Sequence, residues 1–206
     1  MYHRVKNNLQ VSASLLDLQA ETVEDPHARA ILEDCQHRVH VIALIHESLR
    51  QAEALAGLDA ALYLRQLSLH LCEASRPLGQ QITLTLTLEP AHLTVQEALS
   101  CGLILNEWLS NACKHAFPGG RSGEIGVELR EGGPGTGMLR VRDTGIGIPA
   151  GLDLRQTESL GLHLVGLLAE QLGGTITLEC DGGTLWTLTF PLRLKPAAEE
   201  PHASEA

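Results

Sequence analysis

Leu103 to Gly120 reads L-I-L-N-E-W-L-S-N-A-C-K-H-A-F-P-G-G. The run Pro118-Gly119-Gly120 is typical of a helix end, because proline cannot continue a helix and glycine accepts a left-handed backbone. We therefore predict that this stretch forms the last turns of a long central helix. Four of its side chains fall on faces that can be buried: Leu105, Trp108, Leu109 and Ala112.

The polar residues of the same stretch form a stripe. An α-helix turns by about 100° per residue, so Glu107, Asn111 and His115 lie along one face with Lys114 beside them. A carboxylate, a neutral carboxamide oxygen and two potential cations on one face can hold a metal–nucleotide complex. Magnesium suits the arrangement because it takes few protein ligands and completes its shell with water and substrate phosphates. Taken alone, the stripe also fits a solvated polar face.

Composition sets limits on the whole chain. It has 206 residues, 44% of them hydrophobic, which is enough for one substantial core and a smaller module. The balance of 15 Lys and Arg against 25 Asp and Glu gives a net charge of −10, so nucleic-acid binding is not expected. The five scattered cysteines resemble small buried hydrophobes of a reducing compartment. No apolar run reaches about 18 residues, so we expect no membrane segment and a cytoplasmic location.

The first fifty residues predict two helices. Apolar positions between His3 and Gln19 follow a 4, 3, 4 spacing, which is the seam of a packed helix. Asp25-Pro26 supplies an N-cap and a proline for a second helix, whose apolar row is interrupted by Arg38. Two such helices form an antiparallel hairpin, and a second copy completing a four-helix bundle is its natural partner. We expect a homodimer through residues 3–51, driven by two rows on the second helix: Ile31, Cys35, Ile42, Ile45 and Leu49, and Ala28, Leu32, Val39 and His46.

Patterns of both helix and strand follow the hairpin. Ile82 to Leu88 alternates apolar residues with threonine, which predicts a half-buried strand. Thr94-Val95-Gln96-Glu97 fits a capping box at the start of the central helix. We predict further helices at 60–73 and up to residue 172, and further strands at 125–129, 138–142, 175–180 and 184–190. The predicted fold class is α+β, a helical hairpin followed by a two-layer α/β sandwich with a mixed sheet.

Val141 to Pro149 reads V-R-D-T-G-I-G-I-P and follows a predicted strand. An aspartate that leaves a strand, here Asp143, can accept a hydrogen bond from the exocyclic amine of adenine. Gly145 and Gly147 let the backbone approach the ring. A tight turn would also explain the D-T-G alone. The chain has no G-x-x-x-x-G-K-[ST] run and no dinucleotide glycine pattern, so a nucleotide site here must be of another kind.

These stretches resemble motifs of the gyrase, heat-shock chaperone, histidine kinase and MutL group of ATPases. The run N-E-x-x-x-N-A-x-K-H-A-F is similar to the N-box of histidine kinases, and D-x-G-x-G-I-P resembles the G1 box. The resemblance implies that Asn111 coordinates magnesium, that Lys114 and His115 face the phosphates, and that Glu107 sits where the group often places its base. It also implies an adenine site at Asp143.

Two later segments resemble further boxes of the same group. Ser159-Leu160-Gly161 begins an abbreviated G2 box, in which a glycine at a helix start meets phosphate, and residues 150–158 before it resemble a nucleotide lid. Gly182 to Pro191 resembles the closing strand of the group, which implies that Thr184 lies near adenine.

His3 opens the run H-R-V-K-N-N-L-Q, and L-L-D-L-Q-A follows from Leu15 to Ala20. Both runs resemble the phosphoacceptor helix of the histidine kinases related to the HWE kinases, so the resemblance implies that ATP phosphorylates His3. Neutral imidazole suits this role because one of its ring nitrogens is unprotonated. Many histidine kinases carry an acidic residue directly after the histidine, but here Arg4 takes that place and cannot act as a base. Glu107 is therefore our candidate to take the proton.

Together the motifs imply the catalytic core of a sensor histidine kinase. We predict a dimerisation and phosphotransfer hairpin at 1–55, an ATP-binding domain at 56–194 and a disordered tail at 195–206. The resemblance implies ATP and Mg²⁺ as cofactors, the receiver domain of a response regulator as partner, and a sensor domain upstream of this chain.

Two alternatives stay open. A protein-serine kinase of the anti-sigma type would share the ATPase motifs, but the hairpin carrying His3 disfavours it. A nucleotide-binding dimer that has lost transfer activity is disfavoured by intact Asn111, Asp143 and Gly145, although these residues support binding better than chemistry.

Overall fold

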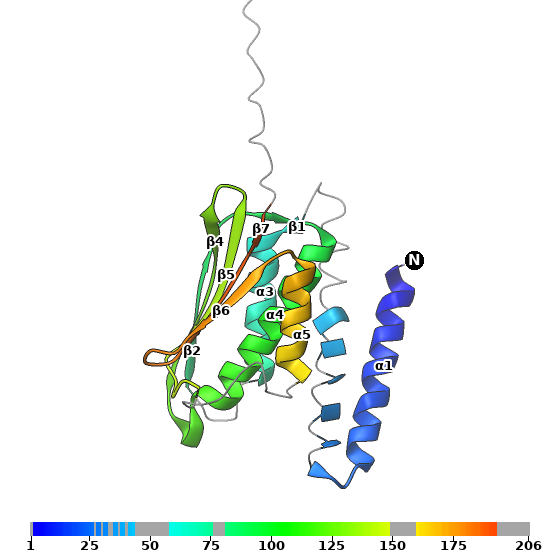
Figure 1. Cartoon of the computed structure of the whole chain (residues 1–206). Helices are drawn as coiled ribbons and strands as arrows, with labels where there is room; N and C mark the ends of the chain where they lie inside the picture. Colours follow the sequence, from blue (N-terminus) through cyan, green and yellow to red (C-terminus); the bar gives the residue numbers. More distant parts are fainter. Residues whose placement is uncertain are drawn as a thin grey trace, which may run out of the picture.

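The computed structural model describes residues 2–26, 28–29, 31–32, 35–36, 38–39, 41–43, 58–75, 81–148 and 160–192. A helical hairpin lies at the N-terminal end, beside a sheet whose one face carries helices (Figure 1). This arrangement confirms the predicted α+β class with a two-layer sandwich. The predicted boundary at residues 55 and 56, the lid at 150–158 and the tail from 195 lie outside the described residues.

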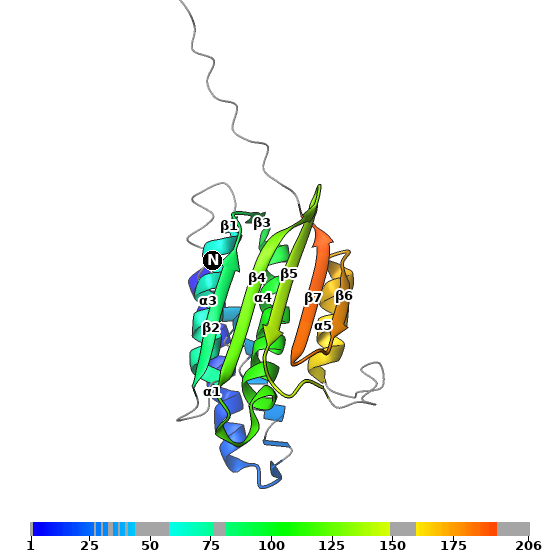
Figure 2. The same cartoon turned by 90° about the vertical axis from the view of Figure 1, so that its left-hand side faces the viewer.

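One mixed sheet and three helices make up the sandwich. The strands are β2 (Ile82–Leu88), β4 (Gly123–Gly133), β5 (Thr136–Asp143), β6 (Thr175–Glu179) and β7 (Thr184–Pro191), the helices are α3 (Ala60–Ser75), α4 (Val95–Asn111) and α5 (Leu160–Gln171), and β1 (Leu58–Asp59) pairs separately with β3 (His92–Leu93). The sheet order is β2-β4-β5-β7-β6, in which β2 is parallel to β4 and the other neighbours are antiparallel. All three helices lie on the same face (Figures 1 and 2).

The sheet follows the predicted alternation but extends further. In β2, Ile82 is buried, and the threonines at 83, 85 and 87 are exposed. β4 and β5 run well past the predicted strand ends, so the glycine-rich loop shrinks to a turn at Pro134-Gly135. Glycines continue the ladder there, with Glu131 opposite Gly137. Side-chain alternation predicts a strand only where apolar residues recur. Backbone pairing does not need side chains, so it also includes the glycines at these strand ends.

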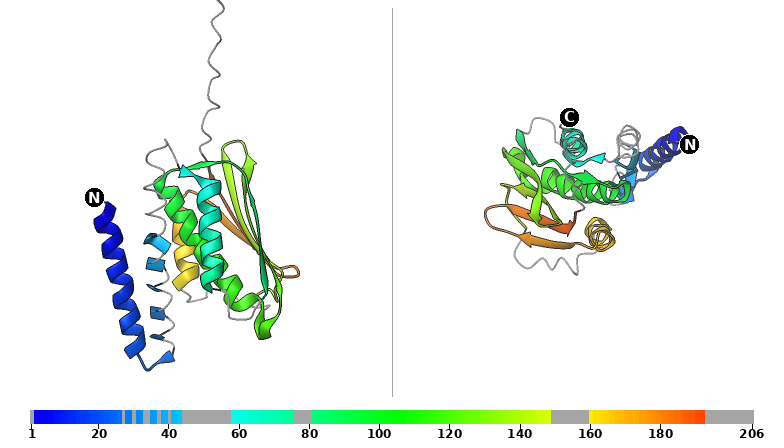
Figure 3. Two further views of the ribbon diagram at one scale, coloured as in Figure 1. Left: turned by 180° about the vertical axis from the view of Figure 1, so that it is seen from behind. Right: turned by 90° about the horizontal axis from the view of Figure 1, so that it is seen from above.

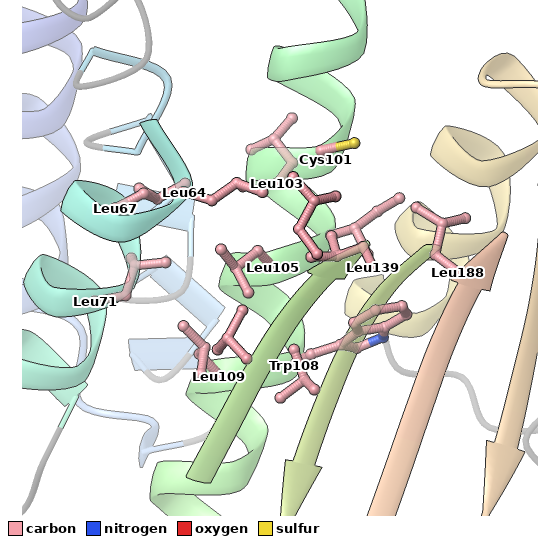
Figure 4. Packing of buried hydrophobic residues seen from close by; sticks show 14 of the residues in the cluster. Leu64, Leu67, Leu71, Cys101, Leu103, Leu105, Trp108, Leu109, Leu139 and Leu188 are labelled. Carbon is pink, nitrogen blue, oxygen red and sulfur yellow. The ribbon is translucent and has the colours of Figure 1, made fainter. Parts of the chain in front are cut away.

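α4 is the centre of the molecule. Its predicted capping box is confirmed: the Thr94 hydroxyl accepts from the Glu97 backbone N–H at 3.3 Å, and the Glu97 carboxylate accepts from the Thr94 N–H at 2.8 Å. Side chains from α3 pack on one side of it, and Trp108 points toward the strands (Figure 4). Trp108 also stacks on Trp186 of β7, with 5.6 Å between ring centroids. α4 is therefore buried against the sheet, with α3 on one side of it and α5 on the other (Figure 3).

Beyond Asn111 the helix departs from the prediction. Residues Ala112–Ala116 form a π-helix, η1, and Pro118–Gly120 form a 3₁₀ turn, η2. Hydrogen bonds in a π-helix run between residues five apart, so the residues after Asn111 are rotated from their α-helical positions. The proline and glycines end the helix as predicted, but the polar stripe drawn at 3.6 residues per turn holds only from Glu107 to Asn111.

α1 (Tyr2–Thr22) and the helical residues between Pro26 and Ala43 form the hairpin. The second helix lies against the sandwich, and α1 lies on its far side (Figures 1 and 3). Val41 is completely buried in the same core as α3 and α4, and Ile42 packs against that core. The sequence assigned Ile42 to a dimer surface. In the structure Ile42 contacts the sandwich instead. Apolar spacing indicates that this face of the second helix is buried, but it does not show which neighbour buries it.

α1 leaves a row of large apolar side chains exposed. Val11, Leu15 and Leu18 are 59%, 55% and 60% exposed, and their 4 and 3 spacing places them on one face. The predicted seam residues Leu9 and Leu16 are half-buried. α1 thus has one face partly covered in this chain and another that is not.

The cysteines are all free, and three of them behave as predicted. Cys72, Cys101 and Cys113 are buried, whereas Cys180 is exposed. Burial, assisted by the nearby Glu97 carboxylate, raises the pKa of Cys101 to about 12, so this thiol stays neutral. Within the described ranges, the structure contains no helix with both the length and the apolar character that crossing a bilayer requires.

Candidate functional site

Asp143 is the last residue of β5, and its side chain is buried at the end of the sheet. Its Oδ1 accepts hydrogen bonds from the backbone N–H of Gly145 at 2.8 Å and from that of Thr184 at 3.3 Å. The second bond exists because β5 and β7 pair Asp143 directly with Thr184. No described residue donates to Oδ2. One carboxylate oxygen is therefore held by the fold, and the other can accept from a ligand.

Two glycines allow the backbone to close around this carboxylate. A Cβ on Gly145 would collide with the carbonyl oxygen of Ala116, and a Cβ on Gly183 would collide with the carbonyl oxygen of Asp143. Gly183 also has a φ of +140°, which side-chain-bearing residues rarely adopt. Gly147 has a φ of +72° and lies over the carbonyl of Gly183. The glycines serve tight packing within the protein as well as access for a ligand.

Ala116 joins the two halves of the site. It is the last residue of the π-helix, and its carbonyl oxygen accepts from the backbone N–H of Ile146 at 3.0 Å. The segment carrying Asn111 is thereby bonded to the loop that follows Asp143. Ala116 and Gly183 were not among the predicted site residues, because both act through backbone contacts with segments distant in the chain.

The other half of the site carries Asn111, Lys114 and His115. Asn111 ends α4, is partly buried, and has no side-chain hydrogen-bond partner among the described residues. Lys114 and His115 follow in the π-helix and are exposed. A half-buried carboxamide oxygen without a partner fits a magnesium ligand, because Mg²⁺ prefers oxygen and needs few protein ligands.

Glu107 lies one turn before Asn111 and is engaged elsewhere. Arg38 of the second hairpin helix donates from Nε to Oε1 at 2.7 Å and from Nη2 to Oε2 at 3.1 Å. The Asn106 side chain adds a third bond to Oε1 at 3.2 Å. In the sequence, Arg38 stands out only as a charged residue that interrupts an apolar row, and this interruption is the signal that could have identified it.

The remaining predicted residues are distributed as follows. Gly161 lies in the first turn of α5 and faces the contact between Arg38 and Glu107. Leu160 begins α5, and Ser159 lies outside the described residues. His3 lies in the first turn of α1. The structure thus brings Asp143, Gly145, Gly147 and Thr184 together, joins them to η1, and places His3 on a separate helix.

Comparisons with known proteins agree with this geometry. Residues 1–75 match the family described as histidine kinase, and residues 96–194 match the family described as histidine kinase-, DNA gyrase B- and HSP90-like ATPase. The chain therefore belongs to the histidine kinases, with an ATP-binding domain of that ATPase group. This confirms the resemblance that the two sets of motifs indicate.

The chain is also similar to individual histidine kinases along most of its length. The sensor histidine kinase PdtaS of Mycobacterium tuberculosis is 29% identical over 183 residues, covering 87% of this chain and 36% of that protein. The blue-light-activated histidine kinase 2 of Erythrobacter litoralis is 27% identical over 195 residues, covering 92% of this chain and 55% of that protein. The chain thus spans about a third to a half of these relatives. The solved histidine kinase domain of a blue-light-activated kinase from Erythrobacter litoralis shares the fold, with a TM-score of 0.70, 24% identity, and 93% and 88% coverage.

Proposed function

We propose that this chain is the catalytic core of a histidine autokinase, which uses ATP to phosphorylate His3 and passes the phosphoryl group to an aspartate of a response regulator. The observation that carries the proposal is the buried Asp143 carboxylate, with one oxygen held by two backbone N–H groups and the other available. A histidine in the first turn of α1 supplies an acceptor in the same chain.

Asp143 gives the site its preference for adenine. The exocyclic amine of adenine donates a hydrogen bond to Oδ2, whereas guanine presents a carbonyl oxygen at that position. Two acceptors facing each other leave a buried polar group unpaired, which costs more than the lost bond itself. The site therefore discriminates against GTP through one carboxylate oxygen.

The opposite half of the site receives the phosphates. Asn111 would hold Mg²⁺ through its carboxamide oxygen, and Lys114 and His115 would face the phosphate oxygens. When bound, the metal ion offsets the charge of the triphosphate and orients it. The bond between Ala116 and Ile146 keeps this half in a constant relation to the adenine half.

Phosphoryl transfer then joins His3 to the γ-phosphorus. A ring nitrogen of His3 forms the new P–N bond as the bond to the bridging oxygen breaks, and ADP leaves. The proton on the other ring nitrogen must pass to a base, for which Glu107 remains our candidate. In the described arrangement both Glu107 oxygens accept from Arg38, so that role requires a different position of the domain. The phosphoryl group subsequently moves from the imidazole to a carboxylate of the regulator.

The hairpin supplies the dimer surface. The exposed row of Val11, Leu15 and Leu18 on α1 is the kind of apolar face that a second hairpin covers in a four-helix bundle. The sequence predicts the dimer surface on the second helix. Because Val41 and Ile42 of that helix pack on the ATP-binding domain, we assign the dimer surface to α1.

Incubation with ATP labelled on the γ-phosphate tests the proposal. The wild type should acquire phosphate that is lost in acid and kept in alkali, and His3→Gln should acquire none while binding ATP normally. His92→Gln, an exposed histidine on β3, serves as the matched control and should be labelled at the wild-type rate. Acid-stable phosphate would instead indicate a protein-serine kinase. Tight ATP binding without any labelling would indicate an inactive binding module.

A further inference from the structure

Among the described residues, Arg38 of the hairpin and Glu107 of the ATP-binding domain form a charged contact between these two parts. The two residues are 69 positions apart, and the fork of Arg38 donates to both oxygens of the carboxylate. Their side chains are only 14% and 10% exposed. An exposed ion pair contributes little, but removing one partner from a pair this buried leaves a charge without compensation.

The start of α5 also packs against the pair of Arg38 and Glu107. A Cβ on Gly161, in the first turn of α5, would collide with Oε2 of Glu107 and lie 3.2 Å from Nη2 of Arg38. α5, which begins at the segment resembling a G2 box, therefore touches the contact between Arg38 and Glu107 directly. Glycine at this position is explained by the contact itself, independently of any phosphate.

Apolar packing surrounds the charged contact. Val41, three positions after Arg38 on the same helix, is completely buried in the core shared with α3 and α4. Ile42 packs against that core as well. The second hairpin helix is thus seated on the ATP-binding domain by apolar side chains, with the Arg38–Glu107 pair adding a directional contact to Gly161 and α4.

The contact between Arg38 and Glu107 lies at a different level along the hairpin from His3, the proposed phosphoacceptor. The hairpin connection is centred near Glu24, so residue 38, which is 14 positions after it, lies level with about residue 10. His3 is then about 7 residues further along, or about 10 Å at a rise of about 1.5 Å per residue. α1 is also one helix further from the sheet, roughly 8–10 Å away. Within one chain, Glu107 and the start of α5 are therefore not next to His3.

We propose that Arg38 is a positioning residue, which latches the ATP-binding domain onto the second hairpin helix and withholds Glu107 until the latch opens for phosphoryl transfer. The latch is the set Arg38, Glu107 and Gly161. The role in transfer rests on the proposed function, whereas the latch itself rests on the contact geometry. Because either charge would be costly to leave buried alone, opening must move the domain far enough for both groups to reach water or new partners.

The experiment compares Arg38→Gln with Arg130→Gln in the full chain. Arg130 also pairs with a glutamate, at 3.3 Å from Glu128, but on β4 and far from the hairpin. We measure autophosphorylation at saturating ATP, ATP affinity, and amide hydrogen exchange of the second hairpin helix. Arg38→Gln should raise the transfer rate and the exchange by about 5- to 30-fold, the factor that corresponds to a loss of about 1–2 kcal/mol, and leave ATP affinity within a few-fold. Arg130→Gln should change none of the three.

Other outcomes overturn the latch. A transfer rate that falls with unchanged affinity would make Arg38 part of the transfer-competent arrangement, and unchanged exchange would make the pair idle. Should the wild type show no phosphohistidine, hydrogen exchange still decides the latch, so failure of the proposed function is distinguishable. The charge swap R38E/E107R should restore the protection that Arg38→Glu alone removes, and loss of protection in both would count against a specific pair.

Discussion

Two buried carboxylates of this chain are held in different ways. Asp143 is bound by backbone N–H groups of its own sheet end, and one of its oxygens stays open. Glu107 is bound by the side chain of Arg38, from a separate helix, and both of its oxygens are filled. A carboxylate held by backbone keeps its position as long as the sheet is folded. One held by a distant side chain can be released without unfolding anything.

The same contrast extends to the regions that carry them. The ATP-binding domain encloses its own core around α4, where Trp108 and Leu105 are almost completely buried. The described part of the hairpin, by contrast, packs its second helix on the ATP-binding domain and leaves the apolar row of α1 exposed. The carboxylate held by backbone and the carboxylate held by a distant side chain thus belong to different parts of the molecule, which fits the proposed separation of nucleotide binding from phosphoryl transfer.

The largest effect should come from disturbing the backbone around Asp143. Gly183→Ala forces a Cβ against the Asp143 carbonyl at a φ of +140°, whereas Gly182→Ala meets no neighbouring atom at a φ of +62°. Gly182→Ala should cost about 1–2 kcal/mol of unfolding free energy, the usual cost of a left-handed residue with a side chain. Gly183→Ala should cost more and also weaken ATP binding. Equal stability of the two variants in urea titrations would contradict the packing argument.

A smaller effect is expected when the fold is kept and only the open oxygen is changed. In Asp143→Asn the remaining oxygen should keep the two backbone bonds, which turns the amide N–H₂ toward the adenine amine and sets donor against donor. ATP affinity should fall by about 10- to 150-fold, corresponding to the ~1.5–3 kcal/mol of a hydrogen bond to a charged group. Calorimetry measures this loss. Asp181→Asn, an exposed aspartate beyond β6, is the control and should bind as the wild type.

The smallest change in stability is expected in the hairpin. Leu15→Glu together with Leu18→Glu should convert the dimer to monomers, because charges would have to enter the bundle, while the unfolding midpoint of the ATP-binding domain stays unchanged. Leu62→Glu changes a leucine of α3 that is equally exposed, at 54%, and should leave the assembly intact. Light scattering reads out the mass. A monomeric wild type would remove the dimer from the proposal. The difference between the hairpin and the ATP-binding domain would then rest on the Arg38–Glu107 contact alone.

The elements and the family could be read from local signals. The capping box at Thr94, the threonine alternation of β2 and the proline and glycines after Phe117 each act through neighbours in the chain, so the sequence alone contains their cause. Asp143 and its glycines were recognisable for the same reason, since their order along the chain is itself the motif. The prediction that His3, Asn111 and Thr184 act in catalysis or binding stays a prediction.

What only the tertiary structure decided involves residues far apart in the chain. Arg38 meets Glu107 across 69 positions, Thr184 reaches Asp143 through strand pairing, and Ala116 bonds to Ile146 through its carbonyl. Helical periodicity could place Glu107 on a polar face, but it could not show that a cation from another helix occupies that face. It also could not foresee the π-helix after Asn111, which depends on where the end of α4 meets the loop after β5. Periodicity records which side of an element is buried, and the identity of the neighbour on that side is settled only when the chain packs.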